Sequence, residues 1–456
     1  MRTLLVPCLL IIALNLHAAD DWPPALKGEK NGTVTLTTDQ FLQVPENVAA
    51  AVKKEGAAPF TVAKTPPMVK LAYHRDLGPD AMTRRLWSTW GDIGVAKDGR
   101  VYVGLGDHAD DVGGNARCFI YQWDPKTAEL KRVVDMNEVI PPANGQPAWS
   151  KVHAKIDEGN DGGIYFCCTL NDGNRAKLPT YKWNDTLPGA QIYRYDPATG
   201  KTAVFANLPA KRCTATSLFD PVRNVWWCNL EAGEGNALWG IDMATKKPVF
   251  QAEDGSMGFN RNFALAKDGS IYFNGKDCIE HFDPVKKTIT PMKSSFGKSP
   301  GMRASTRETK DGWIYGTTHS TNQLFRYRPT DDKLELLGPV WLSGSYTAVI
   351  ELSPDEKYLY YLPGSHGGAF KDGTPVIQYD IAAGKQKVLA FLAPAFDKEH
   401  DYVPAGTYGL KISPDGGSLY VNFNGHPGDK NRPKNMKPIG FGLTSFAQID
   451  IPKSER

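Results

Sequence analysis

Short runs of alternating apolar and polar residues, joined by turn residues, recur along most of the chain. In the stretch 151–169, two such runs are joined by Asp161 and Gly162, which is the short-range signal of a β-hairpin. The second run of each hairpin is rich in aromatic residues, and a third run follows it and ends in most copies near an Asp or Asp-Pro turn. The pattern therefore predicts a series of β-meanders.

The meander occurs seven times. We expect the aromatic-rich second strands at 100–107, 163–170, 224–231, 270–277, 313–320, 358–365 and 418–425. Their spacing, about 43 to 63 residues, is that of a four-stranded blade with its loops. A four-stranded meander cannot bury both of its faces alone, whereas blades stacked in a ring cover one another. We predict an all-β fold, a seven-bladed β-propeller formed as one domain by residues 68–452.

The last repeat lacks an obvious fourth strand after Ile451. We expect an N-terminal strand, either 33–38 or 68–74, to complete it, because such a strand protects the open edge of the last blade. Residues 20–67 are rich in Pro, Ala and Lys. We interpret them as a lead-in segment that wraps the domain or donates a strand to it.

Residues 1–19 have the pattern of a secretory signal peptide, with one Arg, an apolar run from Leu4 to Leu16, and small residues at Ala18 and Ala19. The apolar run is shorter than the roughly 20 residues that span a bilayer, and no later segment is suited to crossing one. The sequence therefore predicts export, to the periplasm or out of the cell, and no membrane span.

Six cysteines follow the apolar run, and an exported protein permits disulfides. Cys213 and Cys228 fall on the two arms of one predicted hairpin and form the pair that we consider for a disulfide. The alternative is that the cysteines are small core residues. The net charge of +3 and the lack of a Lys/Arg block argue against nucleic acid as a partner. We expect a monomer.

Propeller geometry brings the starts of the inner strands and the ends of the second strands to the same rim of the central channel. The starts are Asp92, His153, Arg212, Arg261, Arg303, Tyr346 and Tyr408, and the ends are His108, Thr169, Glu231, Lys276, His319, His366 and His426. A single histidine at a strand end is most often a hydrogen-bonding loop residue, and a single arginine can simply bridge two blades. Five histidines and three arginines at one rim favour a functional site.

A rim of His, Arg and Tyr suggests an anionic substrate held by Arg–carboxylate bonds. Such a set can support proton abstraction next to a carboxylate, followed by β-elimination. An arginine or a metal ion neutralises the carboxylate, a histidine serves as the base, and a tyrosine or a second histidine protonates the leaving oxygen. The paired carboxylates of glycoside hydrolysis are not obvious at this rim.

The segments KVHAKIDEGNDGGIYF, IYRYDPATGK, YYLPGSHGGAFKDGTPVIQYD and TYGLKISPDGGSLYVNFNG resemble those of exported propeller-type polysaccharide lyases, including the ulvan and related uronate lyases. The resemblance spans most of 85–452 and implies catalysis by a His, a Tyr and a carboxylate-neutralising Arg. It makes His153 the catalytic histidine. Thr169 stands where such enzymes often have a second histidine, and His108 is the residue to which that role could pass.

The chain also resembles, more distantly, the oligogalacturonate lyases, propellers that hold manganese with several histidines. This resemblance implies a metal site formed by His319, His366 and His426, at equivalent ends of consecutive blades, for Mn, Ca or Zn. The lyase chemistry itself requires no cofactor when an arginine neutralises the carboxylate.

We therefore expect an exported lyase that cleaves a uronic-acid-containing polysaccharide or oligosaccharide by β-elimination. The candidate catalytic residues are His153, His108, Arg212 and Tyr408. The candidate substrate-binding residues are Arg261, Arg303, Tyr346 and the loop residues Asn174, Arg175, Tyr181 and Trp183, the last by stacking on a sugar. The alternative is a non-catalytic propeller that binds a glycan or a protein through the same face.

Overall fold

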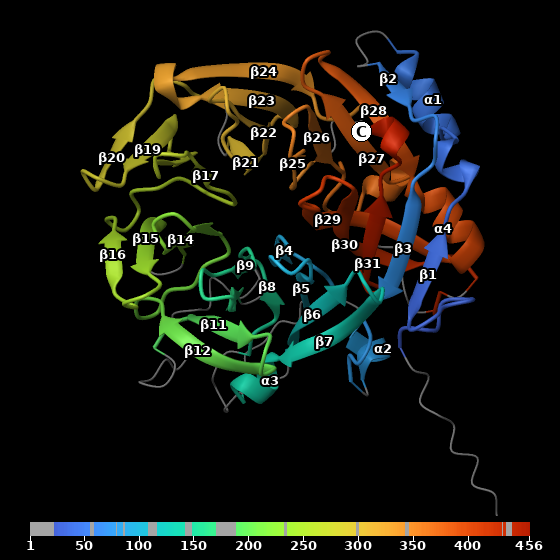
Figure 1. The fold of residues 1–456 in the computed structure, drawn as a ribbon, viewed down its shortest axis with the longest axis horizontal. Helices are drawn as coiled ribbons and strands as arrows, with labels where there is room; N and C mark the ends of the chain where they lie inside the picture. Colours follow the sequence, from blue (N-terminus) through green and yellow to red (C-terminus); the bar gives the residue numbers. More distant parts are fainter. Residues whose placement is uncertain are drawn as a thin grey trace, which may run out of the picture.

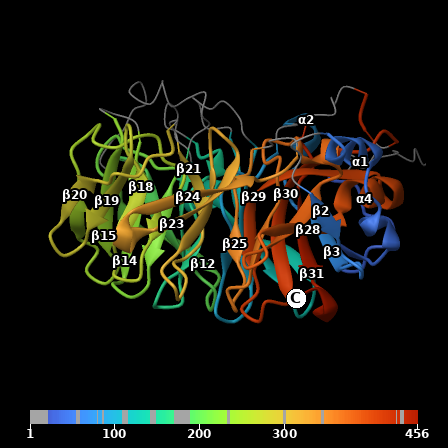
Figure 2. The same cartoon turned by 90° about the horizontal axis from the view of Figure 1, so that it is seen from above.

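The chain folds into a ring of seven small, twisted β-sheets around a common axis, as the repeats predict (Figure 1). The computed structural model describes residues 22–54, 59–78, 80–84, 87–107, 116–141, 148–169, 188–231, 235–297, 301–342, 346–430, 432–434 and 440–456. Seen from the side, the ring is a thick disc (Figure 2). Each blade is built on an antiparallel meander whose first strand lies nearest the centre of the ring (Figure 1).

The first four blades follow one another along the chain. Blade one contains β4 (Gly94–Val95), β5 (Val101–Gly106), β6 (Cys118–Asp124) and β7 (Glu129–Asp135). Blade two contains β8 (Lys151–Val152), β9 (Asp157–Glu158), β10 (Ile164–Thr169), β11 (Gln191–Asp196) and β12 (Lys201–Asn207). Blade three contains β13 (Ser217–Asp220), β14 (Val225–Leu230), β15 (Ala237–Asp242) and β16 (Pro248–Gln251), and blade four contains β17 (Ala264–Leu265), β18 (Ile271–Asn274), β19 (Ile279–Asp283) and β20 (Thr288–Pro291). The predicted turn at Asp161 and Gly162 is present, and Gly162 has a φ of 75°, which glycine adopts without strain.

The last three blades complete the ring. Blade five contains β21 (Met302–Ser305), β22 (Ile314–Thr318), β23 (Gln323–Arg328) and β24 (Lys333–Pro339). Blade six contains β25 (Glu351–Leu352), β26 (Tyr358–Tyr361), β27 (Pro375–Asp380), β28 (Lys385–Phe391) and the parallel strand β2 (Phe60–Val62). Blade seven contains β29 (Tyr402–Ile412), β30 (Ser418–Pro427), β31 (Ser445–Asp450), β3 (Met68–Tyr73) and β1 (Thr33–Leu36).

The N-terminal part of the chain closes the ring at blade seven. β3 pairs antiparallel with β31 over its whole length, for example Val69 with Ile449, and β1 then pairs with β3. Both stretches that the sequence offered as closing strands are therefore used, 68–73 as the fourth strand and 33–36 as a fifth. β2 extends blade six by pairing parallel with β28, so residues of the lead-in segment belong to two blades.

In the described part of the chain, four short α-helices lie outside the sheets: α1 (Glu46–Val52), α2 (Ala81–Arg84), α3 (Met136–Val139) and α4 (Leu392–His400). The 3-10 turns are η1 (Asp39–Leu42), η3 (Pro329–Asp331), η4 (Ala369–Asp372) and η5 (Lys453–Glu455). α4 connects blade six to blade seven and packs Phe396 against Phe41 of the N-terminal segment (Figure 1). Among the described residues, no helix is long and apolar enough to cross a membrane.

The aromatic residues of the second and third strands fill the spaces between blades. Trp123, Trp226, Trp239, Tyr102 and Tyr193 are almost fully buried. This burial explains why each repeat carries an aromatic-rich second strand, since these side chains supply most of the apolar area that one blade hides against the next.

The cysteines of the core are free thiols. The Cys213–Cys228 disulfide that the sequence left open is not formed. Cys213 lies opposite Glu231, whereas Cys228 lies opposite Ser217, so the two thiols do not face each other across the hairpin. Apart from Cys278, which is partly exposed, the described cysteines are buried as small core residues.

Candidate functional site

The inner strands are shorter than the sequence pattern indicates, and irregular segments that precede them line the channel. In blade two, Lys151–Val152 and Asp157–Glu158 pair separately with β10, so His153 lies in a break between two short strands rather than just before one. A short extended segment followed by a turn exposes side chains to the channel from several blades at the same level.

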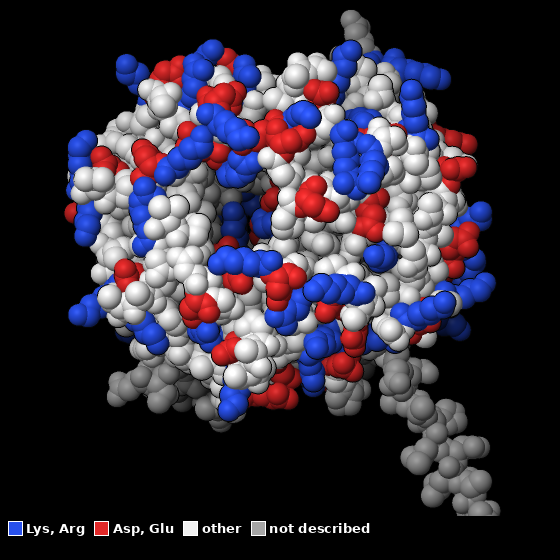
Figure 3. Space-filling view, viewed as in Figure 1, with Lys and Arg blue, Asp and Glu red and all other residues white. Residues whose placement is uncertain are grey.

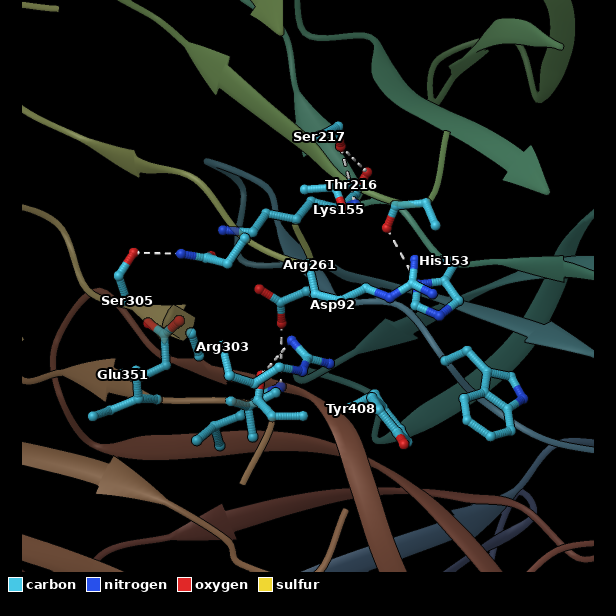
Figure 4. A pocket seen from close by; sticks show the side chains of 18 of the residues that line it. Asp92, His153, Lys155, Thr216, Ser217, Arg261, Arg303, Ser305, Glu351 and Tyr408 are labelled. Carbon is cyan, nitrogen blue, oxygen red and sulfur yellow. Dashed lines mark hydrogen bonds between the residues drawn. The ribbon is translucent and has the colours of Figure 1, made fainter. Parts of the chain in front are cut away.

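A cavity of about 50 Å³ lies in the channel at this level (Figure 4). His153, Arg261, Arg303 and Tyr408, four of the residues singled out in the sequence, line it together with Trp90. A space of this volume admits a carboxylate or a few water molecules but not a sugar ring. A ring-shaped ligand would therefore lie above the cavity and send only one small group into it.

Tyr408 and His366 form a hydrogen-bonded pair at the rim of the cavity. The Tyr408 hydroxyl lies 2.6 Å from His366 Nδ1, and the two residues come from β29 and from the loop after β26. The ring of Tyr346 stacks on His366 with centroids 4.6 Å apart. The His366 side chain is exposed, whereas Tyr408 is buried. The pair thus presents a phenol and an imidazole that can exchange a proton.

Arg303 lies beside both tyrosines. Its guanidinium carbon is 5.4 Å from the Tyr346 ring centroid and 5.7 Å from the Tyr408 ring centroid. Arg303 also donates hydrogen bonds to the Tyr346 hydroxyl and to the carbonyl of Ala348, the latter at 3.3 Å. Because it is only 6% exposed and lines the cavity, its charge acts in a poorly solvated space, where an anionic group would be attracted strongly.

His153 lies across Trp90 from this pair. Its Nδ1 is 3.2 Å from the carbonyl oxygen of Ala215, and because that oxygen can only accept, Nδ1 carries a proton and Nε2 is the nitrogen that accepts a proton whenever the ring is neutral. The indole of Trp90 is stacked near His153, with centroids 6.4 Å apart, and lies 4.9 Å from the ring of Tyr408. Trp90 therefore forms an aromatic floor between two proton-carrying side chains.

The other two predicted arginines hold neighbouring chain segments. Arg261 lines the cavity and forms an ion pair with Glu231, 3.2 Å away, as a blade-bridging arginine does. Arg212 is buried and turned to Asp254, 2.7 Å away, and it donates to the carbonyls of Leu230 and Gly235. It does not line the cavity, and its guanidinium is directed to these partners.

The three histidines proposed as metal ligands do not form one group. His319 contacts Tyr346 edge-on, with centroids 5.0 Å apart, whereas His426 contacts Phe370 and has its Nδ1 2.8 Å from the carbonyl of Pro427. His366 Nδ1 is occupied by Tyr408. Within the described part of the chain, no three His, Cys, Asp or Glu residues are placed to hold a metal ion. These residues do not fit the metal site that the distant resemblance implies.

Burial and neighbouring charge keep two of these histidines neutral. Burial, with the nearby charges of Arg303, His366 and Arg261, lowers the pKa of His319 to about 4. Burial also lowers the pKa of His426, although its contact with Pro427 opposes the shift. His319 is therefore an uncharged imidazole at neutral pH and adds no positive charge to the rim.

The lining of the cavity also contains charged side chains from four blades, which meet across the channel. Lys411 lies 2.7 Å from both Asp92 and Glu351 and joins blade seven to blades one and six. Lys155 of blade two lies at the same level (Figure 4). We call Asp92, Lys155, Glu351 and Lys411 the charged waist. Burial lowers the pKa of Lys155 and raises that of Glu351.

The sequence reasoning singled out Asp92 but did not find the other members of the waist, or Trp90. A signal existed for Lys155, Glu351 and Lys411, since each places a charge between apolar neighbours in an inner segment, as in HAKID, AVIEL and GLKIS. A charge at such a position needs a partner across the channel. His108, Asn174, Arg175, Tyr181 and Trp183 lie outside the described residues.

The ring of seven sheets defines the chain as a seven-bladed β-propeller. No protein-family model matches it, and no curated protein matches its sequence. A chain of the mitotic checkpoint complex has the same fold, with a TM-score of 0.51 and 11% identity, over 88% of this chain and 99% of that one.

Two further solved structures have lower similarity. The extracellular domain of a putative hybrid two-component system from B. thetaiotaomicron has a TM-score of 0.48 at 9% identity, over 83% of this chain and 44% of that one. The WD40 repeats of RRP9 have a TM-score of 0.48 at 10% identity, over 80% of this chain and 98% of that one. Identities this low speak to the fold alone.

Proposed function

We propose that the protein is an exported lyase that cleaves a uronic-acid-containing polysaccharide or oligosaccharide by β-elimination. The observation that carries the proposal is the Tyr408–His366 hydrogen bond of 2.6 Å beside the buried cation of Arg303. A proton-transferring pair next to a poorly solvated positive charge is what removal of a proton next to a carboxylate requires.

In this proposal the substrate carboxylate enters the cavity of about 50 Å³ and binds Arg303, with Arg261 as a second cation. Neutralising the carboxylate lowers the energy of the negative charge that develops when the neighbouring C5 proton leaves. The sugar ring rests above the cavity, near the rings of Tyr346 and Tyr408. Arg212, which is held by Asp254, takes no part.

His153 and Tyr408 divide the proton transfers between them. His153 Nε2 takes the C5 proton, and the electron pair of the C5–H bond forms the C4–C5 double bond. The C4–O4 bond breaks, and O4 takes the phenol proton of Tyr408. His366, which is hydrogen-bonded to the resulting phenolate and exposed to solvent, relays a proton from water to it, and His153 releases the C5 proton to water before the next turnover. His108 and the loop residues Asn174, Arg175, Tyr181 and Trp183 remain proposed contributors to catalysis and to covering the substrate.

The test is the ultraviolet absorbance of the unsaturated uronate product during incubation with a panel of uronate polymers. On the substrate that responds, Tyr408→Phe and His153→Ala should each lower kcat by at least about 100-fold, the lower bound for losing one general acid or base. Tyr358→Phe is the matched control, since this partly exposed tyrosine of β26 does not line the cavity, and it should retain full activity.

The alternative function is a non-catalytic propeller that recognises the carboxylate of a glycan or a protein. The volume of the cavity supports this binding function as well as it supports the lyase, because about 50 Å³ suits the capture of one carboxylate whether or not a reaction follows. Absence of product on every polymer, together with calorimetric binding that Arg303→Met removes, would establish this function and refute the lyase.

A further inference from the structure

The channel has a second, larger cavity on the other side of the charged waist. Its volume is about 350 Å³, within the range of small-molecule sites. Lys155, Ser305, Glu351 and Lys411 line both cavities. The other lining residues differ between the two cavities and follow one another along each inner segment. In blade five, for example, Arg303 and Ala304 line the first cavity and Arg307 lines the second. The larger cavity is therefore the opposite mouth of the channel, away from the rim that holds Tyr408.

The wall of this second cavity is divided between apolar and charged side chains. Leu218, Phe263 and Leu265 form one side, from blades three and four, and Leu352 adds to the apolar lining from blade six. Arg307 lies with the lysines of the waist on the charged side. The centre of the ring is hollowed in the space-filling view, and both basic and acidic side chains line the hollow (Figure 3). A ligand that fills the cavity must itself be partly apolar and partly charged.

Most charges around this mouth already have protein partners. Lys411 is held by Asp92 and Glu351, and Arg307 by Glu356. Lys155 differs. Its backbone N–H and carbonyl bond to Ser217 Oγ, but none of the described residues forms a hydrogen bond or an ion pair with its ammonium group. The nearby carboxylates act on it only through longer-range attraction.

We propose that this opposite mouth is a binding site for a small amphiphilic carboxylate, whose anionic end pairs with Lys155 and whose apolar body lies against Leu218, Phe263 and Leu265. Lys155 is partly exposed at this mouth, and its ammonium lacks the carboxylate contacts that hold Lys411 and Arg307, so an anion that pairs with it gains an attraction that a neutral molecule lacks. The five donors of the Arg307 guanidinium, of which one is bonded to Glu356, offer further hydrogen bonds to the same anion.

The class of ligand follows from the two halves of the wall. A purely polar anion, such as acetate, would leave the leucines and Phe263 in contact with water. A neutral apolar molecule would leave Lys155 unpaired. A medium-chain carboxylate such as hexanoate satisfies both halves at once, and the volume of about 350 Å³ accommodates its chain.

The experiment is calorimetric titration of the purified protein with hexanoate, hexanamide and hexylammonium. We expect hexanoate to bind at least tenfold more tightly than the amide, and hexylammonium not to bind. Lys155→Met, which keeps the length of the side chain, should weaken hexanoate at least tenfold. Lys357→Met is the control, because this exposed lysine pairs with Asp355 near the surface and should change nothing.

Two outcomes would overturn the proposal. One is hexanoate binding that Lys155→Met leaves unchanged, and the other is equal binding of hexanoate and hexanamide to the wild-type protein, a comparison that does not depend on any variant folding. Arg303→Met separates this site from the first cavity. Loss of hexanoate binding in Arg303→Met but not in Lys155→Met would mean that the carboxylate binds at the rim, which also contradicts the proposal.

Discussion

Removal of Lys411 tests how the structure holds charge inside the channel. Its Nζ lies 2.7 Å from Asp92 and 2.7 Å from Glu351, and the three side chains are at most 26% exposed. A hydrogen bond to a charged group contributes about 1.5–3 kcal/mol, and removing one partner of a buried ion pair destabilises by about 3–5 kcal/mol. We expect Lys411→Met to lower the free energy of unfolding by about 3–5 kcal/mol at pH 7.

The loss should depend on pH. Burial raises the pKa of Glu351, and Lys411 opposes that rise. Without Lys411, the folded protein binds a proton at Glu351 at a higher pH than the unfolded chain does, so lowering the pH stabilises the folded variant. A protonated carboxyl needs no cation beside it. The difference between Lys411→Met and the wild type should therefore become smaller as the pH falls from 7 to 5.

Urea unfolding followed by circular dichroism at pH 5, 6 and 7 provides the measurement. Lys357→Met serves as the control and should stay within about 0.5 kcal/mol of the wild type, because its partner Asp355 is half exposed. Adding Glu351→Gln to Lys411→Met should recover part of the stability. A loss below about 1 kcal/mol at pH 7, or the same loss at pH 5, would show that the waist does not depend on this lysine.

Three further predictions concern other buried groups. Burial lowers the pKa of His74 to about 4, and none of the described residues bonds to its ring nitrogens. As the pH falls, the unfolded chain therefore binds a proton at His74 at a higher pH than the folded chain does, which destabilises the fold. In unfolding measurements between pH 6.5 and 4, His74→Phe should lack about 3 kcal/mol of this acid destabilisation. Leu71→Ala, in the closing strand and fully buried, should cost about 2–5 kcal/mol in urea unfolding, whereas Met68→Ala at the exposed edge should cost far less. Arg212→Met should destabilise by about 3–5 kcal/mol, because Asp254 loses its partner, yet leave uronate affinity unchanged by calorimetry.

The fold could be predicted from the sequence because its signal repeats. Each blade needs an aromatic-rich second strand to cover its neighbour, and each turn needs an Asp or Gly, so seven weak hairpin signals support one another. The closing strand was predicted only as one of two stretches. Both 33–36 and 68–73 alternate in the right way, and the sequence contains no sign that a blade can take both.

The candidate site was predictable in position but not in detail. Propeller geometry brought His153, Arg303 and Tyr408 to one cavity, as expected. It could not separate Arg303 from Arg212, because the difference lies in their partners: Asp254, which holds Arg212, follows it only after all four strands of blade three. Such a contact is set by how the loops at the two ends of a blade pack, and the spacing of the strands does not reveal it.

The pairing of β3 with β31 also sets an order of events during folding. Val69 and Ile449 are neighbours in the finished ring, yet almost the whole chain lies between them. While the chain is being made, blades one to six can form as local meanders, but the edge of β3 has no partner until the last strand has emerged. Contacts this distant in sequence form slowly. Closure is therefore the final step, and the unpaired edges of an unclosed ring make this the stage most exposed to aggregation.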